Sequence, residues 1–349
     1  MATTRITSTL AGFAGAAILA IASLVLIAAA PGTPAASAAG PKPSTGSYSW
    51  PVKPFDRAHP VRANFGDPRT TFHGPPTLRG LMTSGGSFSF HFGVDIAVPD
   101  GTAVYPVRSG TARLLGGRNV EVDSGDGFTT QYWHIVPAIK PGQHVTVGQT
   151  VLGHVMKGYE HVHFTELDSG RSVNPLAPGH MGPYEDTTAP QVTEISFRAD
   201  RSNAEVIPEA LSGVVVPVVR AADTTALPVR GIWGGLPVAP ALLTWHIERA
   251  NDGRVVIDER VAFDVREAIP ANDEFWSVYA RGSRQNMATF GKQRAWRTPG
   301  TYLYRLTHSS FDTRNLPNGI YRLVVTAADI RGNSGSLAQV FIIRNGQGT

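Results

Sequence analysis

The sequence predicts an all-β protein made of two successive β domains. Short runs rich in Val, Ile, Thr and aromatic residues alternate with Gly and Pro turns along most of the 349 residues, which is the pattern of short strands. No window carries the apolar repeat of 3.6 residues that an amphipathic helix requires. Breaks rich in Gly, Pro, Ser and Thr at residues 40–47 and 183–190 separate two parts that are each long enough to bury a core.

An export segment is expected before the first domain, at residues 1–39. Arg5 is followed by an almost wholly apolar stretch at residues 10–30, and an Ala-x-Ala site at residues 36–38 follows in a run of small residues. This order is typical of a cleaved signal peptide. The alternative is an uncleaved membrane anchor, because an apolar stretch of about 20 residues can span a bilayer. Both readings place the rest of the chain outside the cytoplasm.

The composition narrows the chemistry that is available. The chain has no cysteine, so a metal site must use His, Asp, Glu or water, and there is no disulfide framework. The formal net charge is +4, and no Lys/Arg run interleaved with aromatic residues is present, so nucleic-acid binding is not expected. Nothing in the sequence indicates an oligomeric state.

Strands are expected throughout both domains. In the first domain, residues 48–182, they are expected at 92–98, 103–107, 111–115, 120–122, 129–134, 150–155 and 161–167. In the second, residues 191–349, they are expected at 192–197, 214–219, 242–249, 254–263, 301–308, 320–328 and 337–343. Asn318-Gly319 is a strong hairpin signal before the sixth of these. About seven strands joined by turns predict a β-sandwich, with residues 265–299 as a less regular insertion.

The first chemical motif is His91-x-x-x-Asp95. On a strand, residues 91 and 95 share one face, while Phe92 and Val94 point to the other. Fully extended, the two candidate ligands would lie about 13 Å apart at roughly 3.3 Å per residue, too far for one metal ion. The chain must therefore bend between them, and Gly93 is where a bend costs least.

The second motif is His161-Val162-His163, and a third histidine, His134, ends the predicted strand 129–134. Residues i and i+2 of a strand face the same side about 6.6 Å apart. One imidazole of this pair can thus ligate a metal ion while its neighbour reaches the metal-bound water or the substrate. The spacing does not decide which histidine has which role.

Together these residues form the pattern of a catalytic zinc site. His91, Asp95 and one of His161 and His163 supply three nitrogen or oxygen ligands and leave a fourth position open for water. Zinc lowers the pKa of its bound water to about 7, so that the water can attack a carbonyl group. The remaining imidazoles are then available to take the water's proton and to stabilise the tetrahedral intermediate.

The first domain resembles the lysostaphin/LytM-type zinc endopeptidases, the twenty-third metallopeptidase family. The resemblance rests on HFGVDIAVPDGTAVYPV at residues 91–107, SGT at 109–111, QYWH at 131–134, IKPGQHVTVGQTVLG at 139–153 and HVHFTE at 161–166. It covers about residues 50–180. It implies a compact, mostly antiparallel β domain with a groove over one zinc ion per chain, and peptidoglycan cross-bridge or stem peptides as substrates.

The resemblance also implies a role for each matched residue. His91, Asp95 and His163 correspond to the zinc ligands, and His161 and His134 to the catalytic histidines. Arg69 matches a family position near the site and is a tentative substrate-binding residue. The sequence departs from the family in an extra loop at residues 70–89, which contains His73. This loop leaves two points open: which substrate the enzyme prefers, and whether the loop keeps the enzyme latent.

The second domain offers no catalytic constellation. NGIYRLVVTAADIRGN at residues 318–333 resembles the end of a bacterial immunoglobulin-like or fibronectin-like module, which implies a binding, spacing or shielding role. The sequence therefore predicts an exported, wall-associated zinc endopeptidase acting on peptidoglycan. Two alternatives stay open: a non-catalytic protein that binds the wall or regulates its hydrolases, and a peptidase acting on a protein other than the wall.

Overall fold

The computed structural model of this protein describes residues 47–70, 88–288 and 297–346. The export segment, the apolar stretch at residues 10–30, nearly all of the linker 40–47, and His73 lie outside the described residues, as does most of the loop 70–89. In the part of the chain that is described, no helix is long and apolar enough to cross a membrane.

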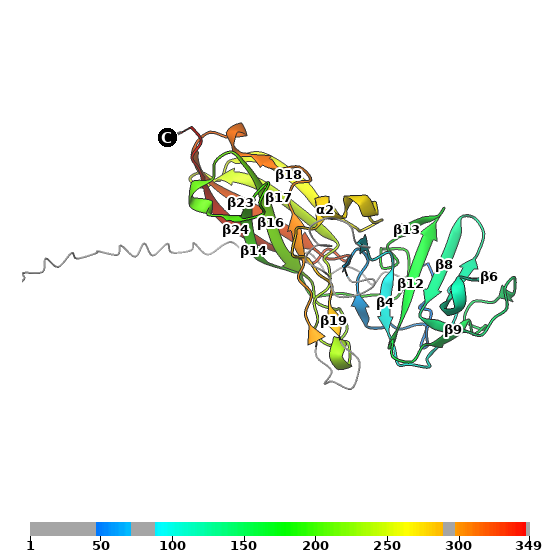
Figure 1. The fold of residues 1–349 in the computed structure, drawn as a ribbon. Coiled ribbons are helices and arrows are strands. Elements are labelled where there is room, and N and C mark those ends of the chain that lie inside the picture. Colours follow the sequence, from blue (N-terminus) through cyan, green and yellow to red (C-terminus); the bar gives the residue numbers. More distant parts are fainter. Residues whose placement is uncertain (1–46, 71–87, 289–296, 347–349) are drawn as a thin grey trace, which may run out of the picture. The chain divides into compact units, whose positions relative to one another are not determined.

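The predicted all-β class is confirmed, and the first domain consists of three antiparallel sheets. The eight-stranded sheet has the order β1-β4-β12-β8-β7-β6-β10, with β13 also paired to β12; β5, β11 and β9 form a second sheet, and β2 and β3 a third (Figure 1). The strands are β1 Val61–Ala63, β2 Pro68–Arg69, β3 Ser89–Phe90, β4 Val94–Ala97, β5 Ala103–Val104, β6 Gly110–Leu114, β7 Asn119–Asp123, β8 Phe128–Trp133, β9 Ile135–Pro137, β10 His144–Val145, β11 Gly153–Val155, β12 His161–Asp168 and β13 Arg171–Val173.

Strand β12 lies between β4 and β8, and this position creates the site. Its buried Val162 and Phe164 alternate with His161 and His163 along the strand. In the register of the sheet, His163 lies directly opposite Asp95 of β4 and opposite Trp133 of β8. Opposite residues of antiparallel strands have their Cβ atoms about 4.5–5.5 Å apart. Motifs that are about 70 residues apart in the chain are thereby brought into contact.

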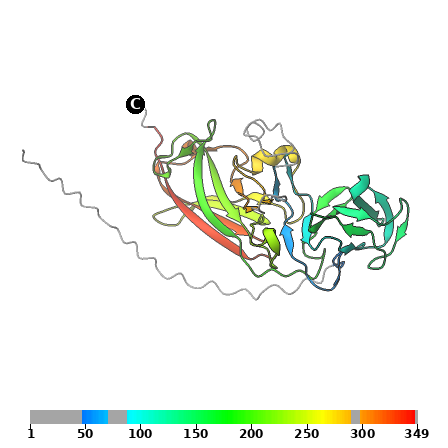
Figure 2. The ribbon, with the colours of Figure 1, turned by 60° about the horizontal axis from the view of Figure 1, so that its bottom comes forward.

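The second domain is a β-sandwich of two antiparallel sheets (Figure 2). One sheet has the order β15-β14-β16-β21, with β22 also paired to β16, and the other has the order β18-β17-β23-β24. Phe197 of β14 packs against Phe341 of β24, which joins the two inner faces. The strands are β14 Gln191–Ala199, β15 Glu205–Val206, β16 Val214–Ala222, β17 Leu242–Arg249, β18 Val255–Asp264, β19 Met287–Ala288, β20 Arg297–Thr298, β21 Leu303–Arg305, β22 Phe311–Asp312, β23 Gly319–Ala328 and β24 Ser334–Ile343.

Helices are short in the described residues. The predicted irregular insertion, residues 265–299, contains the helix α2 Phe275–Val278 and the strand pair β19–β20. The 3-10 turns are η1 Gly116–Arg118, η2 Pro208–Ala210, η3 Gly231–Trp233, η4 Asn272–Glu274 and η5 Thr313–Asn315. The predicted strand 103–107 is cut to β5, which ends before Pro106, since proline lacks the N–H that a ladder needs.

The two domains share one hydrophobic core, although each sheet draws its strands from one side of residues 183–190. Most buried apolar residues of both domains form one continuous cluster, beside a small separate one in the second domain, and residues 41–349 group into one compact unit. Phe90 of β3 packs against Phe275 and Tyr279. The Tyr279 hydroxyl donates a hydrogen bond to the carbonyl of Gly66 at 2.7 Å. The division at residues 183–190 stays a prediction from the sequence.

Candidate metal centre and its cleft

The bend that the His91–Asp95 spacing requires lies at Gly93. The backbone bends at this residue, between the end of β3 and the start of β4 at Val94. A Cβ at position 93 would lie 2.3 Å from the carbonyl oxygen of Phe164 and 2.8 Å from Thr165 Oγ1. Only glycine therefore lets the chain pass so close to β12, and this close passage brings His91 back toward Asp95.

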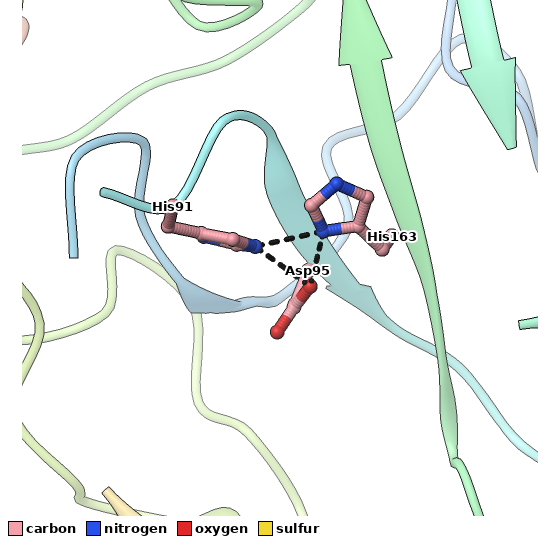
Figure 3. A group of neighbouring side chains, drawn as sticks. All are labelled: His91, Asp95 and His163. Atoms are coloured by element: carbon pink, nitrogen blue, oxygen red, sulfur yellow. Dashed lines mark hydrogen bonds and ion pairs between the residues drawn. The ribbon is translucent and has the colours of Figure 1, made fainter. Parts of the chain in front are cut away.

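Three side chains from two strands and one loop converge on one point (Figure 3). His91 Nε2 lies 2.8 Å from His163 Nδ1 and 3.1 Å from Asp95 Oδ1, and His163 Nδ1 lies 3.1 Å from the same oxygen. All three residues are buried, with between 2% and 7% of their surface exposed. The spacing left His161 and His163 as alternatives for the third position, whereas the family resemblance named His163; in the structure His163 Nδ1 lies at this point.

The geometry of this triangle fits a zinc ion. A circle through the three ligand atoms has a radius of about 1.7 Å, smaller than the 2.0–2.1 Å of Zn–N and Zn–O bonds, so one ion can contact all three atoms. Two imidazoles and one carboxylate are also a donor set that catalytic zinc sites use. The residues present therefore fit zinc in both distance and chemistry.

Hydrogen bonds behind the ligands aim their lone pairs at this point. The Nδ1–H of His91 donates to the carbonyl of Asn64 at 2.8 Å, so its Nε2 carries the free lone pair. His163 Nε2 lies 2.9 Å from Thr165 Oγ1, and donation of its N–H to that hydroxyl leaves the lone pair of Nδ1 free. These bonds orient both rings, and the three atoms then face one another as acceptors, an arrangement that a cation satisfies.

Burial determines the protonation of the ligands. It lowers the pKa of the His91 imidazole to about 3, so this ring is neutral and free to ligate near pH 7. Burial also disfavours the charged form of Asp95, but the surrounding imidazoles of His91, His161 and His163 outweigh it and hold the pKa of Asp95 well below its ordinary value. Near neutral pH the group thus contains the neutral imidazole of His91 and the carboxylate of Asp95.

His161 lies beside the triangle rather than in it. Its Nδ1–H donates to the carbonyl of Tyr159 at 2.6 Å, which makes Nε2 an acceptor, and Nη2 of Arg62 donates to it. That Nε2 lies 3.6 Å from Asp95 Oδ1 and 3.4 Å from Nη2 of Arg62. Burial holds the pKa of His161 well below its ordinary value, so the ring is a neutral proton acceptor next to the candidate metal centre.

His134, the last of the five predicted site residues, lies next to His161. It directly follows β8 with a φ of +65°, a left-handed conformation that is uncommon for residues other than glycine. Its ring stacks on Tyr159 with centroids 4.5 Å apart and lies 4.8 Å from the ring of His161. Burial lowers its pKa to about 4, so it too is neutral at pH 7.

Two arginines contact the far oxygen of Asp95. Nη2 of Arg69, predicted from the sequence, lies 3.3 Å from Asp95 Oδ2. Nε of Arg62, which sequence reasoning missed, lies 3.9 Å from the same atom. The two guanidinium groups orient Asp95 and leave its Oδ1 to the histidines. Arg62 belongs to the three-residue strand β1, and its only signal in the sequence was a charged residue between Val61 and Ala63.

A cleft opens over the candidate centre in two adjoining parts. The larger part has a volume of about 420 Å³ and is walled on one side by the aromatic rings of Phe92 and Trp133. The smaller part has a volume of about 180 Å³ and is more polar, with Arg62 and Asp67 in its wall. His134 lines both parts. A peptide lying along this cleft would pass directly over the five predicted residues.

Comparison with known proteins gives one family match and several similar solved structures. Residues 89–175 match the family model described as Peptidase family M23. The chain is similar in fold to a structure described as a peptidase M23 of Pseudomonas aeruginosa, at 22% identity over 42% of this chain and 55% of that one, with a TM-score of 0.26. It is also similar to the catalytic domain of lysostaphin of Staphylococcus simulans, at 20% identity over 32% of this chain and 86% of that one, with a TM-score of 0.25.

A third similar structure is a zinc-containing peptidase of Vibrio cholerae, at 23% identity over 36% of this chain and 38% of that one, with a TM-score of 0.28. The chain spans about half the length of the first of these structures. The match to the family model begins just before His91 and ends after His163, so it encloses the whole motif set apart from Arg69.

Proposed function

We propose that this protein is an exported, zinc-dependent endopeptidase that hydrolyses peptide bonds of peptidoglycan in cross-bridge or stem peptides, because residues 89–175 match the model of peptidase family M23. One observation carries the proposal: His91 Nε2, Asp95 Oδ1 and His163 Nδ1 converge within 3.1 Å of one another. Two further neutral imidazoles lie beside them. Export rests on the apolar segment of residues 10–30, and the wall as substrate rests on the family.

In this mechanism the chain holds one zinc ion through His91, Asp95 and His163. Zinc, when bound, lowers the pKa of a water ligand so that the water can attack a peptide carbonyl. Nε2 of His161 is the acceptor nitrogen of the ring, because the other nitrogen donates to Tyr159, and it is placed to accept a proton as the water attacks. His134, next to it, can hold a proton for the leaving amine or donate a hydrogen bond to the carbonyl oxygen.

The presence of all five residues favours an enzyme over a non-catalytic wall-binding protein. A protein that only regulates other hydrolases has no use for two neutral imidazoles beside an intact ligand triangle. The aromatic and polar walls of the cleft suit an extended peptide. The third possibility, a peptidase acting on other proteins, shares this chemistry and differs only in substrate.

The first experiment tests turnover on the wall itself. Residues 40–349 are incubated with isolated peptidoglycan, with and without a zinc chelator, and the released fragments are analysed by mass spectrometry. We expect new peptide ends that disappear with chelator and return with added zinc. If a protein shown to hold one zinc ion released nothing from the wall but cut denatured proteins, the wall would be the wrong substrate.

A matched variant tests the division of labour between the histidines. We expect His161→Ala to keep one zinc ion per chain and to lose at least about 100-fold in kcat, since general-base catalysis contributes about 10²–10⁴-fold. Zinc content and cleavage are measured on the same preparation. Cleavage at the wild-type rate by a zinc-loaded His161→Ala variant would remove His161 from the mechanism.

A further inference from the structure

The second domain supplies part of the wall of the cleft. Gln285 lines both the larger and the smaller part, and Trp233 and Asn286 line the smaller one. All three residues lie beyond residue 190, outside the segment that matches the peptidase family. A domain that only spaced or shielded the enzyme would not need to place side chains against the candidate centre.

Gln285 is held rigidly by contacts on both sides. Its Oε1 accepts a hydrogen bond from the backbone N–H of Thr70 at 2.9 Å. The neighbouring Arg284 exchanges two backbone hydrogen bonds of 2.9 Å with Thr301. Asn286, on its other side, donates from Nδ2 to the carbonyl of Pro237 at 2.6 Å. These hydrogen bonds fix the backbone around Gln285 and its side chain, and a binding site requires such rigid support.

The amide group of Gln285 has one end that is free to bind a ligand. Because Oε1 accepts from Thr70, the orientation of the amide is determined and its NH₂ group is turned away from that bond. Among the described residues, no hydrogen bond is formed by this NH₂ group. An unused donor on the wall of a cleft that runs over the candidate centre is the kind of group that orients a peptide carbonyl.

The second domain also supports the residues that surround the centre. The guanidinium of Arg62, which contacts His161, lies 3.9 Å over the ring of Trp233, a cation–π contact that fixes its position. Asn64, whose carbonyl accepts from His91, donates from Nδ2 to the carbonyl of Ala239 at 3.1 Å. The architecture of the centre and the wall of the cleft thus depend on the same domain.

We propose that the second domain completes the substrate site, and that Gln285 donates a hydrogen bond from Nε2 to a backbone carbonyl of an extended peptide bound across the centre. This inference rests on the proposed peptidase function and deepens it, because it assigns a substrate-binding residue outside the family segment. Phe92 and Trp133, which line the larger part of the cleft together with Gln285, offer aromatic surface to the same peptide.

Two substitutions in the full chain separate binding of substrate from support of Thr70. Gln285→Ala removes both the acceptor for Thr70 and the free donor, whereas Gln285→Glu keeps an acceptor oxygen for Thr70 and removes the donor. Gln339→Ala, on β24 and outside both parts of the cleft, is the matched control. Each protein is assayed for KM and kcat on stem-peptide dimers released from peptidoglycan, for zinc content and for Tm.

Binding of the same dimers to zinc-free protein is measured by calorimetry. We expect both Gln285 variants to raise KM and the dissociation constant by about tenfold, as loss of one hydrogen bond of about 1–1.5 kcal/mol predicts. Values for kcat, zinc content and Tm should stay within error of the control. If Gln285→Glu bound and cut like the wild type while Gln285→Ala did not, Gln285 would serve only to hold Thr70, and the proposal would be overturned.

The binding measurement distinguishes this inference from the proposed function. Dimers that bind to wild-type protein in a manner sensitive to Gln285, without being cut when zinc is present, would contradict the peptidase and support the subsite. Dimers that are cut by all variants with the same KM would support the peptidase and overturn the subsite. If the wild type neither bound nor cut them, the peptide cleft itself would be wrong.

Discussion

Among the described residues, two groups of three buried, potentially metal-binding residues occur, and they differ in chemistry and in access. His91, Asp95 and His163 form one group; Asp186, Asp223 and Asp329 form the other, and in each the ligand atoms lie within 4.8 Å of one another. The first group lines a cleft of about 420 Å³. The second as a whole borders a cavity of only about 10 Å³, and Asp223 alone also lines a separate pocket of about 200 Å³.

The acidic group satisfies its own charges in other ways. Asp329 Oδ1 accepts from the backbone N–H groups of Arg331 and Asn333 and so closes a turn. Asp186 Oδ1 accepts from the backbone and the hydroxyl of Thr188. Burial, together with the other two carboxyl groups, raises the pKa of Asp223 to about 8, so this carboxyl is largely protonated at pH 7.

Ligand atoms close together therefore do not suffice to identify a metal centre. The histidine group has lone pairs that are aimed by outer hydrogen bonds and a cleft that gives access. In the aspartate group, the repulsion between carboxylates is relieved by protonation. This difference can be tested by changes made in matching pairs, from the largest expected effect to the smallest.

The largest effect is expected from removing one ligand from each group. His163→Ala should lower the zinc content from one ion per chain to well below that and abolish peptide cleavage, because two remaining ligands hold zinc poorly. Asp223→Asn should retain full zinc content and cleavage. Both quantities are measured by elemental analysis and by the peptidoglycan assay, and loss of zinc from Asp223→Asn would reverse the assignment of the two groups.

A second large effect is expected from Gly93→Ala. The added Cβ would meet the backbone carbonyl of Phe164 at 2.3 Å and His163 Nε2 at 2.9 Å, so β4 or β12 must shift, at a cost of about 3 kcal/mol. Denaturant unfolding and zinc titration measure the change. Gly117→Ala, where a Cβ meets nothing within 4 Å, is the control; equal stability of the two variants would contradict the close approach at residue 93.

An intermediate effect is expected from Thr165→Val. This change keeps the size of a fully buried side chain but removes the hydroxyl that orients His163. Loss of such an outer partner typically weakens metal binding about 10–100-fold. Zinc affinity is measured by competition with a chelating dye. Thr165→Ser, which keeps the hydroxyl, should bind zinc nearly as well as the wild type, and equally weak binding by both variants would point to packing instead.

The smallest effect is a pH dependence of stability that belongs to the aspartate group. The raised pKa of Asp223 means that the folded protein keeps a proton that the unfolded chain releases above about pH 4. The stability that this proton contributes is present at low pH and is lost as the pH rises through about 8. Between pH 5 and pH 9, the Tm of the wild type should fall by about 3 °C more than that of Asp223→Asn.

The control for this prediction is Asp258→Asn, which changes an exposed carboxylate on β18. Its Tm should follow the pH in the same way as that of the wild type. An Asp223→Asn variant with the same pH profile as Asp258→Asn would mean that Asp223 is ionised throughout this range.

Much of the fold could be predicted because it depends on local patterns. The strands β7, β8, β12, β17 and β23 differ from their predicted ranges by one or two residues at most, since alternation of buried and exposed side chains is visible in the sequence. Short strands were harder. Strand β1 has three residues and β2 and β3 have two each, too few to show a period, and Arg62 was missed with them.

The same contrast applies to the site. The need for a bend between His91 and Asp95 followed from the length of an extended chain, and the bend lies at Gly93 as predicted. The residues that orient the centre could not be found in this way. Asn64 lies 27 positions from His91, and Gln285 lies 215 positions from Thr70. Contacts between residues so far apart in the chain produce no short-range pattern in the sequence.

The sequence by itself determined the β class and the need for a bend near Gly93, and it predicted five site residues, because strand periodicity, chain length and ligand chemistry are local properties. Only the tertiary structure decided how closely His91, Asp95 and His163 approach one another, that Arg62 faces His161, and that Gln285 of the second domain reaches the cleft. These outcomes depend on sheet register and on a shared core. Both are set by which distant surfaces pack together, and that is a property of the folded chain as a whole.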